Sequence, residues 1–529
     1  MKAFAELLDR LAFAPQRSAK LRLLAGYFRA TPDPDRGLAL AALTGALDLA
    51  AAKPALVRAL VAERVDPVLF AWSYDFVGDL AETVSLVWPQ RPTNRAAPTL
   101  GEVVAALRAA GRTEVPALLA GFLDTLDATG RWALLKLVTG GLRVGVSARL
   151  AKTALAEGFG KDVAAVEELW HVLAPPYEPL FAWLEDRGPP PAIGDSLAFR
   201  PLMLAHPLED GEAGRIEPAA FRAEWKWDGI RVQLVARGGE ARLYSRSGDD
   251  IGPAFPELVA GIGFEAVLDG ELMVMRGGMP APFNDLQQRL NRKVVTAAMR
   301  RDFPAGIRLY DLLFEGGQDL RGLPFDVRRA RLEAWFAAHR PAAMDLSPLV
   351  AFDSAEALAA LRAGARDAAI EGLMLKRADS PYLAGRPKGH WFKWKRDPLT
   401  ADTVLMYAQR GHGKRSSFYS DFTFGAWDGE RLVPVGKAYF GFTDEELAAL
   451  DRWVRHHTVK KFGPVREVEP GLVLEVAFDS IHPSPRHRSG LAMRFPRIHR
   501  IRWDKPAAEA DPLTRLKAMV ATGLPPAPT

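Results

Sequence analysis

The chain has 529 residues, of which 48% are hydrophobic and 25% charged, with a formal net charge of +5 at pH 7. This length predicts roughly two to four domains. No apolar run approaches the roughly 20 residues of a membrane span. The lack of cysteine excludes disulfides and thiolate metal sites. The mild positive charge permits a polyanionic partner without requiring one.

Residues 1–187 are predicted to be helical. Leucines recur at helical spacing, as at Leu7, Leu8 and Leu11, and turn-forming stretches such as 127–130 separate the segments. The early charges at the N-terminus, without an apolar stretch, argue against a secretory signal. We therefore expect a cytoplasmic protein.

Consecutive prolines at 189–191 make residues 188–195 an extended linker. From 196 to 397, short alternating strands mix with helices, which predicts an α+β domain.

Residues 398–510 are predicted to form an all-β barrel. Roughly five strands and one helix, the latter at 444–461, fit a small barrel of the OB type. Residues 511–529 are predicted to be a C-terminal tail with a short helix near 513–520.

Lys226 stands between Trp225 and Trp227 and is followed by an Asp-Gly pair. Apolar and polar residues then alternate over 230–234, so Lys226 is expected in the turn that leads into a half-buried strand. A lysine between apolar rings loses hydration, and a nearby arginine adds positive charge. Both effects favour the neutral, nucleophilic amine. A surface lysine beside a turn fits this short stretch equally well.

Further stretches follow Lys226 in a fixed order. They are SRSG at 245–248, LDGEL at 268–272, YDLL at 310–313, EGLMLK at 371–376, WFKWK at 391–395, and RFPR at 494–497 running to RWDK at 502–505. This ordered set resembles the nucleotidyltransferase motifs of the ATP-dependent DNA ligases. Each motif alone is weak, whereas the complete series in order is specific.

The resemblance implies three domains and a reaction. A helical DNA-binding domain would be followed by an adenylation (nucleotidyltransferase) domain of ATP-grasp-like ligase fold and by an OB-fold domain. Such an enzyme uses ATP and Mg²⁺ to seal nicks in duplex DNA, in repair, replication and recombination. A covalent lysyl-AMP forms, AMP passes to the 5′-phosphate, and the 3′-hydroxyl then attacks. NAD-dependent bacterial ligases carry a four-cysteine zinc module, which this chain lacks.

The resemblance also implies a role for each motif residue. Lys226 would be the nucleophile, Glu224 would contact the adenine edge, and Tyr310 would stack on the base, although packing in the core explains an isolated tyrosine as well. Glu271 and Glu371 would hold the metal. The other predicted ATP or AMP contacts are Arg231, Arg246, Lys376, Lys393, Lys395, Arg494, Arg497 and Lys505, with Glu271 also near the ribose.

Arg494, Arg497, Asp504 and Lys505 would come from the OB-fold domain. In the family this motif closes over the active site during lysine adenylation and swings away when DNA is engaged. That behaviour implies a hinge at 396–400.

Residues 136–147, KLVTGGLRVGVS, resemble a glycine-rich turn of the helical DNA-binding domain. Glycines let backbone N–H groups approach phosphates, and Lys136, Arg143 and Arg149 add charge. A helix-packing corner with solvated basic residues is the alternative.

Two other functions stay open. RNA ligases and capping-type guanylyltransferases share the lysine motif, and a DNA-binding module with an inactive ligase core would keep the motifs without the reaction. The DNA ligase interpretation implies nicked duplex DNA as partner, a monomer that encircles it, association with the nucleoid of a bacterium, and repair proteins as further partners.

Overall fold

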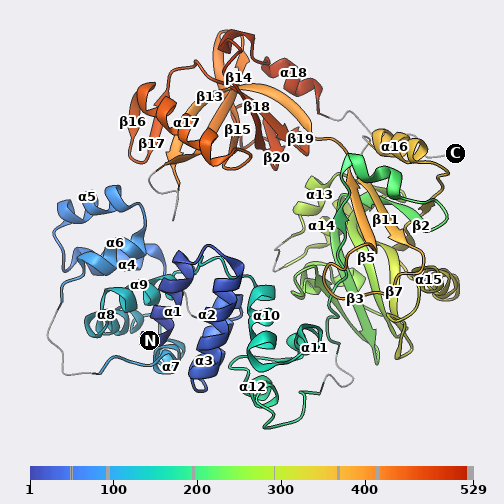
Figure 1. Ribbon diagram of the computed structural model, residues 1–529, viewed down its shortest axis with the longest axis horizontal. Coiled ribbons are helices and arrows are strands. Elements are labelled where there is room, and N and C mark those ends of the chain that lie inside the picture. Colours follow the sequence, from blue (N-terminus) through green and yellow to red (C-terminus); the bar gives the residue numbers. More distant parts are fainter. Residues whose placement is uncertain are drawn as a thin grey trace.

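The computed structural model describes residues 1–47, 49, 52–90, 96–192, 197–290, 292, 294–365, 370–411 and 418–520. Figure 1 shows three bodies in chain order, which are a helical region, a mixed region and a β-rich region. Residues 193–195 of the predicted linker and 521–529 of the predicted tail lie outside the described residues. Among the helices of the described part, none is both long and apolar enough to cross a membrane.

The first region is helical, as predicted. Helix α1, for example, buries one apolar face with Phe4, Leu7, Leu8 and Leu11. The helices are α1 (Lys2–Phe13), α2 (Arg17–Ala30), α3 (Asp35–Thr44), α4 (Pro54–Ala62), α5 (Pro67–Val77), α6 (Leu80–Val87), α7 (Leu100–Ala109), α8 (Val115–Thr125), α9 (Ala128–Val138), α10 (Ala148–Phe159), α11 (Val163–Leu169) and α12 (Glu178–Leu184).

The mixed region contains two sheets with helices beside them. The strand order is β1-β12-β11-β2-β10 in the five-stranded sheet and β4-β3-β5-β7-β8 along the main path of the seven-stranded sheet, where β6 and β9 pair with β5 and β7. The strands are β1 (His206–Pro207), β2 (Phe221–Trp227), β3 (Ile230–Arg237), β4 (Glu240–Ser245), β5 (Ala266–Arg276), β6 (Met279–Pro280), β7 (Ala305–Glu315), β8 (Gln318–Asp319), β9 (Met344–Leu346), β10 (Leu349–Val350), β11 (Ile370–Arg377) and β12 (Trp391–Lys395).

Helices of the mixed region pack on these sheets. The long helix α15 contacts β7 of the seven-stranded sheet, and α16 contacts β11 of the five-stranded sheet. The helices are α13 (Phe283–Gln287), α14 (Ala297–Asp302), α15 (Phe325–His339) and α16 (Ala355–Gly364).

The chain passes from one sheet to the other directly after Trp227, the neighbour of Lys226. Strand β2 belongs to the five-stranded sheet and β3 to the seven-stranded one, and only Asp228 and Gly229 separate them. A Cβ atom on Gly229 would lie 2.5 Å from the carbonyl oxygen of Leu272. Glycine is therefore required for the crossing to pass so close to β5.

The β-rich region forms the predicted barrel with more strands than expected. Helix α17 (Asp444–His456) ends earlier than predicted, because residues from Thr458 onward pair as an edge strand with β17. The strands are β13 (Leu399–Arg410), β14 (Tyr419–Asp428), β15 (Arg431–Ala438), β16 (Thr458–Phe462), β17 (Val465–Val468), β18 (Val473–Phe478), β19 (Ser480–Pro483), β20 (Leu491–Arg494) and β21 (Arg497–Arg502), and the predicted tail helix is α18 (Leu513–Ala518).

His171 packs the helical region against the mixed region. Its ring lies edge-on to Phe199 with 4.6 Å between centroids, and a Cβ atom on Gly248 would lie 2.2 Å from its Cε1 atom. Burial, followed by the charge of Lys152, lowers the pKa of His171 to about 4. The neutral ring is thus part of the contact.

We expect acid to weaken this contact. The pKa of His171 is about 4 in the folded chain and about 6.5 in an unfolded one, so the unfolded chain binds the proton first as the pH falls. The free energy of unfolding should therefore decrease by roughly 1–3 kcal/mol as the pH falls from about 6.5 to about 4. Denaturant titrations at several pH values measure this change.

A His171→Gln variant is the control for this prediction. It should show a smaller decrease in stability over the same pH window. An identical decrease in both proteins would show that other groups carry the acid sensitivity.

Candidate active site

A pocket of about 410 Å³ lies between the two sheets of the mixed region. This volume is in the range of pockets that hold small-molecule ligands. Strands from both sheets line it, so the crossing at residues 228–229 brings the sequence motifs together. The lining contains ten of the predicted residues, Glu224, Lys226, Arg231, Arg246, Glu271, Tyr310, Glu371, Lys376, Lys393 and Lys395.

The amine of Lys226 meets a carboxylate in this pocket. Lys226 lies within strand β2, so the prediction that it lies in the turn is wrong. Its Nζ atom is 2.5 Å from Oε2 of Glu371. The two flanking tryptophans do not enclose the Lys226 amine between apolar rings. Trp225 packs on a separate apolar cluster, and the centroid of the Trp227 ring lies 4.2 Å from the guanidinium carbon of Arg308.

A β-bulge directs Glu371 to the lysine. The pairing of β11 with β2 shifts between Ile370 and Gly372, so Glu371 is the extra residue opposite the end of β2. Gly372 has φ of +143°, and a Cβ atom there would lie 2.2 Å from the carbonyl oxygen of Trp394. The glycine of this motif therefore permits the bulge.

One end of the pocket is a buried charge network around Glu224. Its carboxylate meets the Lys376 ammonium at 2.6 Å and the Arg329 guanidinium at 3.2 Å. Burial raises the pKa of Glu224, and Lys376 and Arg329 oppose that rise. Lys376 is only 1% exposed and lies 4.5 Å from the centroid of the Tyr310 ring, so it supports this end of the pocket. Its predicted contact with phosphate stays a prediction.

The Arg231 guanidinium forms its hydrogen bonds with neighbouring protein groups. Its guanidinium bonds both carboxylate oxygens of Asp269, at 3.0 and 2.6 Å, and the carbonyl oxygen of Met203 at 2.7 Å. It also donates to the Tyr382 hydroxyl at 3.0 Å. This placement favours a supporting role for Arg231 over a direct contact with the nucleotide.

The opposite end of the pocket is cationic. Burial, followed by the charges of Arg386 and Lys226, lowers the pKa of Lys393. Lys395 and Arg246 add further positive charge to this wall. Within the described residues no carboxylate pairs with Lys393, so an anionic ligand would complete the charge balance here.

Three carboxylates lie close to Lys226. Burial would raise the pKa of Glu371, but the charges of Lys226 and Lys395 outweigh it and hold that pKa at about 2. Burial raises the pKa of Glu271 to about 8, and Lys226 opposes this rise. Burial and the charge of Glu371 raise the pKa of Asp228.

These carboxylates fit a Mg²⁺ ion that shares its ligands with phosphate. Glu271 and Glu371 line the pocket, and hard oxygen donors are what Mg²⁺ prefers. The charge of Glu371 raises the pKa of Glu271, a repulsion that a cation would relieve. Among the described residues, no group of three or more His, Asp or Glu side chains is arranged as a complete metal site. Phosphate oxygens and water would supply the remaining ligands.

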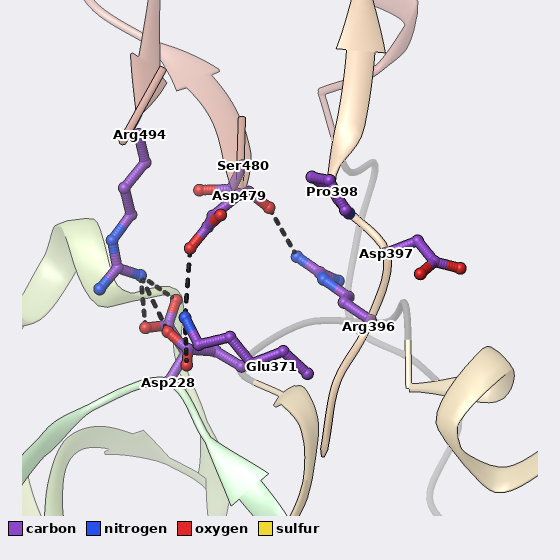
Figure 2. A pocket seen from close by; sticks show the side chains of 9 residues that line it. Asp228, Glu371, Arg396, Asp397, Pro398, Asp479, Ser480 and Arg494 are labelled. Atoms are coloured by element: carbon purple, nitrogen blue, oxygen red, sulfur yellow. Dashed lines mark hydrogen bonds and ion pairs between the residues drawn. The ribbon is translucent and has the colours of Figure 1, made fainter. Parts of the chain in front are cut away.

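The β-rich region brings one of its predicted residues to this centre. Arg494 bonds the carboxylate of Asp228 and lies 3.8 Å from Glu371, as Figure 2 shows. Arg497 pairs with Asp479 at 3.2 Å. Lys505 pairs with Asp402 at 2.7 Å on the barrel and does not line the pocket, and Asp504 pairs with Arg502.

The predicted DNA-binding residues have different environments. Lys136 pairs with Asp79 at 2.6 Å, whereas Arg143 is exposed after the turn. Arg149 lies against Gly385 of the mixed region. Lys20, which sequence reasoning missed, donates to the carbonyl oxygens of Val144 and Gly145 at 2.7 and 3.0 Å and so fixes the turn.

Sequence reasoning also gave no role to three residues near the pocket. Asp228 lies inside the lysine motif and meets Arg494. Arg386 lines the cationic wall, and the neighbouring Gly385, Lys388 and Gly389 were the available signal. Asp479 follows the apolar stretch at 472–478, and nothing in its sequence neighbourhood distinguishes it from a surface carboxylate.

Comparisons with known proteins identify the family that the chain resembles. A family model described as "ATP dependent DNA ligase domain" matches residues 202–395, and one described as "ATP dependent DNA ligase C terminal region" matches residues 415–505.

Relatives resemble the chain over nearly its whole length. A "Probable DNA ligase" of Koribacter versatilis (strain Ellin345) is 34% identical over 97% of this chain and 96% of its own. "DNA ligase 1" of Korarchaeum cryptofilum (strain OPF8) is 31% identical over 98% of this chain and 97% of its own. A solved structure titled "Pmar-Lig_PreS3" has a TM-score of 0.60 at 17% identity and covers 94% of this chain and 99% of its own, which shows similarity of fold.

The two lysines of the pocket should differ in their effect on stability. Lys376→Met leaves the buried Glu224 carboxylate without its partner at 2.6 Å, so we expect a loss of about 3 kcal/mol in the free energy of unfolding. Lys393→Met removes a side chain that lies among other cations, so the loss should stay below about 1 kcal/mol. Urea titrations of both variants check this, and equal losses would contradict the buried network.

Proposed function

The chain belongs to the ATP-dependent DNA ligase family, and from that premise we propose that Lys226 attacks ATP and carries AMP to a nick in duplex DNA. The observation that carries the proposal is the position of the Lys226 amine, 2.5 Å from Glu371 inside a ligand-sized pocket. One end of that pocket offers Glu224 and Tyr310, and the other a cationic wall.

The residues that line the pocket favour one orientation of ATP in this proposal. The adenine would lie at the end of Glu224 and Tyr310, and the phosphates would lie along Lys393 and Lys395. In this orientation the α-phosphate comes near Lys226. Positive side chains stabilise the charge that develops on the non-bridging oxygens during the attack.

In the first step the Lys226 nitrogen forms a bond to the α-phosphorus, the bond to the β-phosphate oxygen breaks, and pyrophosphate leaves. Glu371, with its pKa near 2, is a poor acceptor for the lysine proton. It orients the amine instead, and the proton passes to solvent or to the leaving group.

Glu271 and Glu371 are the residues that would hold Mg²⁺. When bound, this ion would neutralise phosphate charge and assist the departure of pyrophosphate. Arg494, from the barrel, would act at the same end of the pocket.

The later steps need DNA. An oxygen of the 5′-phosphate displaces Lys226 from AMP, and the 3′-hydroxyl then attacks that phosphate and releases AMP. We propose that the exposed Arg143 and the glycine-rich turn contact the duplex backbone, and that the chain acts as a monomer around the DNA.

The other functions make distinguishable predictions. A capping-type enzyme would be labelled by GTP in place of ATP, and an inactive ligase core would bind DNA without forming a labelled protein. Similarity to DNA ligases that extends over the helical region as well favours the DNA ligase.

Replacement of Lys226 tests the nucleophile. Lys226→Ala should give no protein-bound AMP after incubation with α-labelled ATP, whereas affinity for nicked duplex DNA should stay near that of the wild type. Denaturing gels and binding titrations measure the two properties. Lys226→Arg is the matched control, because it keeps a positive charge beside Glu371 but cannot act as the nucleophile at neutral pH.

Lys226→Arg should therefore be unlabelled as well. Labelling of either variant would refute the assignment of Lys226. For the wild type, a band formed with ATP and discharged by nicked DNA is expected.

Replacement of Arg143 tests the DNA contact. Arg143→Ala should weaken binding of nicked duplex and lower the slope of log affinity against log salt by about 1. Lysine adenylation, which needs no DNA, should be unchanged. Lys136→Ala is the comparison, because Lys136 is paired with Asp79 and should affect DNA binding less. A larger loss of DNA affinity in Lys136→Ala than in Arg143→Ala would contradict the proposed contact of Arg143.

A further inference from the structure

A second, much smaller pocket adjoins the first at the boundary between the mixed region and the barrel. It is lined by Asp228, Glu371, Lys395, Arg396, Asp397, Pro398, Asp479, Ser480 and Arg494. Its volume of about 20 Å³ is close to that needed for a single water molecule. This space is therefore too small for a nucleotide. The residues around it form a contact between the mixed region and the barrel.

Asp479 is the centre of that contact (Figure 2). Its carboxylate pairs with the Lys395 ammonium of the mixed region at 3.3 Å and with the Arg497 guanidinium of the barrel at 3.2 Å. Its backbone N–H donates to the carbonyl oxygen of Arg494 at 3.0 Å. Its own carbonyl oxygen accepts from Arg396 at 3.2 Å.

Two of these four contacts, to Lys395 and Arg396, cross from the mixed region, and the other two hold Asp479 within the barrel. Lys395 is the last residue of β12 and lines the nucleotide pocket, whereas Asp479 directly follows β18 of the barrel. The backbone bond to Arg494 places Asp479 beside the segment whose arginine reaches Asp228 and Glu371.

We propose that Asp479 is a positioning residue for lysine adenylation, holding the barrel in the docked arrangement that brings Arg494 beside Lys226. The inference rests on the proposed function of the pocket. Without the Asp479 charge, Arg497 would lose the carboxylate that it pairs with, and Lys395 would keep Glu371, at 3.4 Å, as an anionic partner. The attraction between Asp479 and Lys395 across the boundary would be lost, which would favour separation of the barrel from the pocket.

The side chains in this contact are partly exposed, with 25% of Asp479, 43% of Lys395 and 32% of Arg497 accessible. Each pair is therefore individually weak. Docking held by weak pairs can be released once per reaction cycle, as an enzyme that must next admit DNA requires.

The consequence is a difference between reaction steps. Attack of Lys226 on ATP needs Arg494 docked, whereas joining of a nick that already carries AMP does not use the pyrophosphate leaving group. Loss of Asp479 should slow the first step and spare the last.

The test uses the full-length chain with Asp479→Asn, first treated with pyrophosphate to remove any bound AMP. Single-turnover adenylation with α-labelled ATP should be about tenfold slower or more than in the wild type. Sealing of a chemically pre-adenylated nick should stay within about twofold. Asp479→Glu, which keeps the charge, should recover part of the adenylation rate.

Asp421→Asn is the matched control. Like Asp479, Asp421 is a barrel residue that pairs with a lysine, in this case Lys437 at 3.2 Å. Asp421 lines neither pocket. Both steps should be unchanged in this variant. A double-mutant cycle with Arg497→Gln should be non-additive, so that the double variant is little slower than Asp479→Asn alone.

Two results would overturn the inference. Adenylation by Asp479→Asn at the wild-type rate would show that docking does not depend on this residue. Equal losses in adenylation and in sealing of the pre-adenylated nick would indicate a general structural role. Failure of the proposed function is a separate outcome, because the wild-type chain itself would then remain unlabelled.

Discussion

The carboxylate of Glu371 is the interaction on which the site depends. It meets Lys226 at 2.5 Å, Lys395 at 3.4 Å and Arg494 at 3.8 Å, so it joins two strands of one sheet to the barrel. Burial would raise the pKa of Glu371, but the charges of Lys226 and Lys395 outweigh it and keep that pKa low. Because like charges repel, the Glu371 carboxylate stabilises the close approach of these cations, which the proposed function assigns to phosphate binding. The β-bulge at Gly372 is the backbone feature that makes this possible.

Buried charges and partly exposed charges have different roles in the pocket. The charges of Glu224, Lys376 and Asp269 are satisfied by neighbouring protein groups and fix the walls of the pocket. In contrast, Lys393 has no carboxylate partner among the described residues and faces the cavity. Buried, paired charges resist movement because separation leaves an unpaired charge in a dry environment. The partly exposed cations keep the freedom that ligand exchange requires.

Features set by the local sequence pattern could be predicted, whereas features set by contacts between distant segments could not. Alternation correctly located the strand that begins at Ile230, and motif order brought ten residues to one pocket. The helix from Asp444 was predicted too long, since a short edge strand and a helix end share the same polar composition. The partner of Lys226 could not be predicted, because a bulge in a strand far away in sequence sets it. Lys505 lies near Arg494 in the chain, yet β21 carries it to Asp402.

The connection between the mixed region and the barrel is very short, since β12 ends at Lys395 and β13 begins at Leu399. Such a tether keeps Arg494 at a high effective concentration beside the pocket, of the millimolar order or above. The proposed docking would therefore be an intramolecular equilibrium that loses little translational entropy, and contacts too weak to hold two separate proteins would suffice. Because those contacts are ion pairs, ionic strength would then control how long the barrel stays docked.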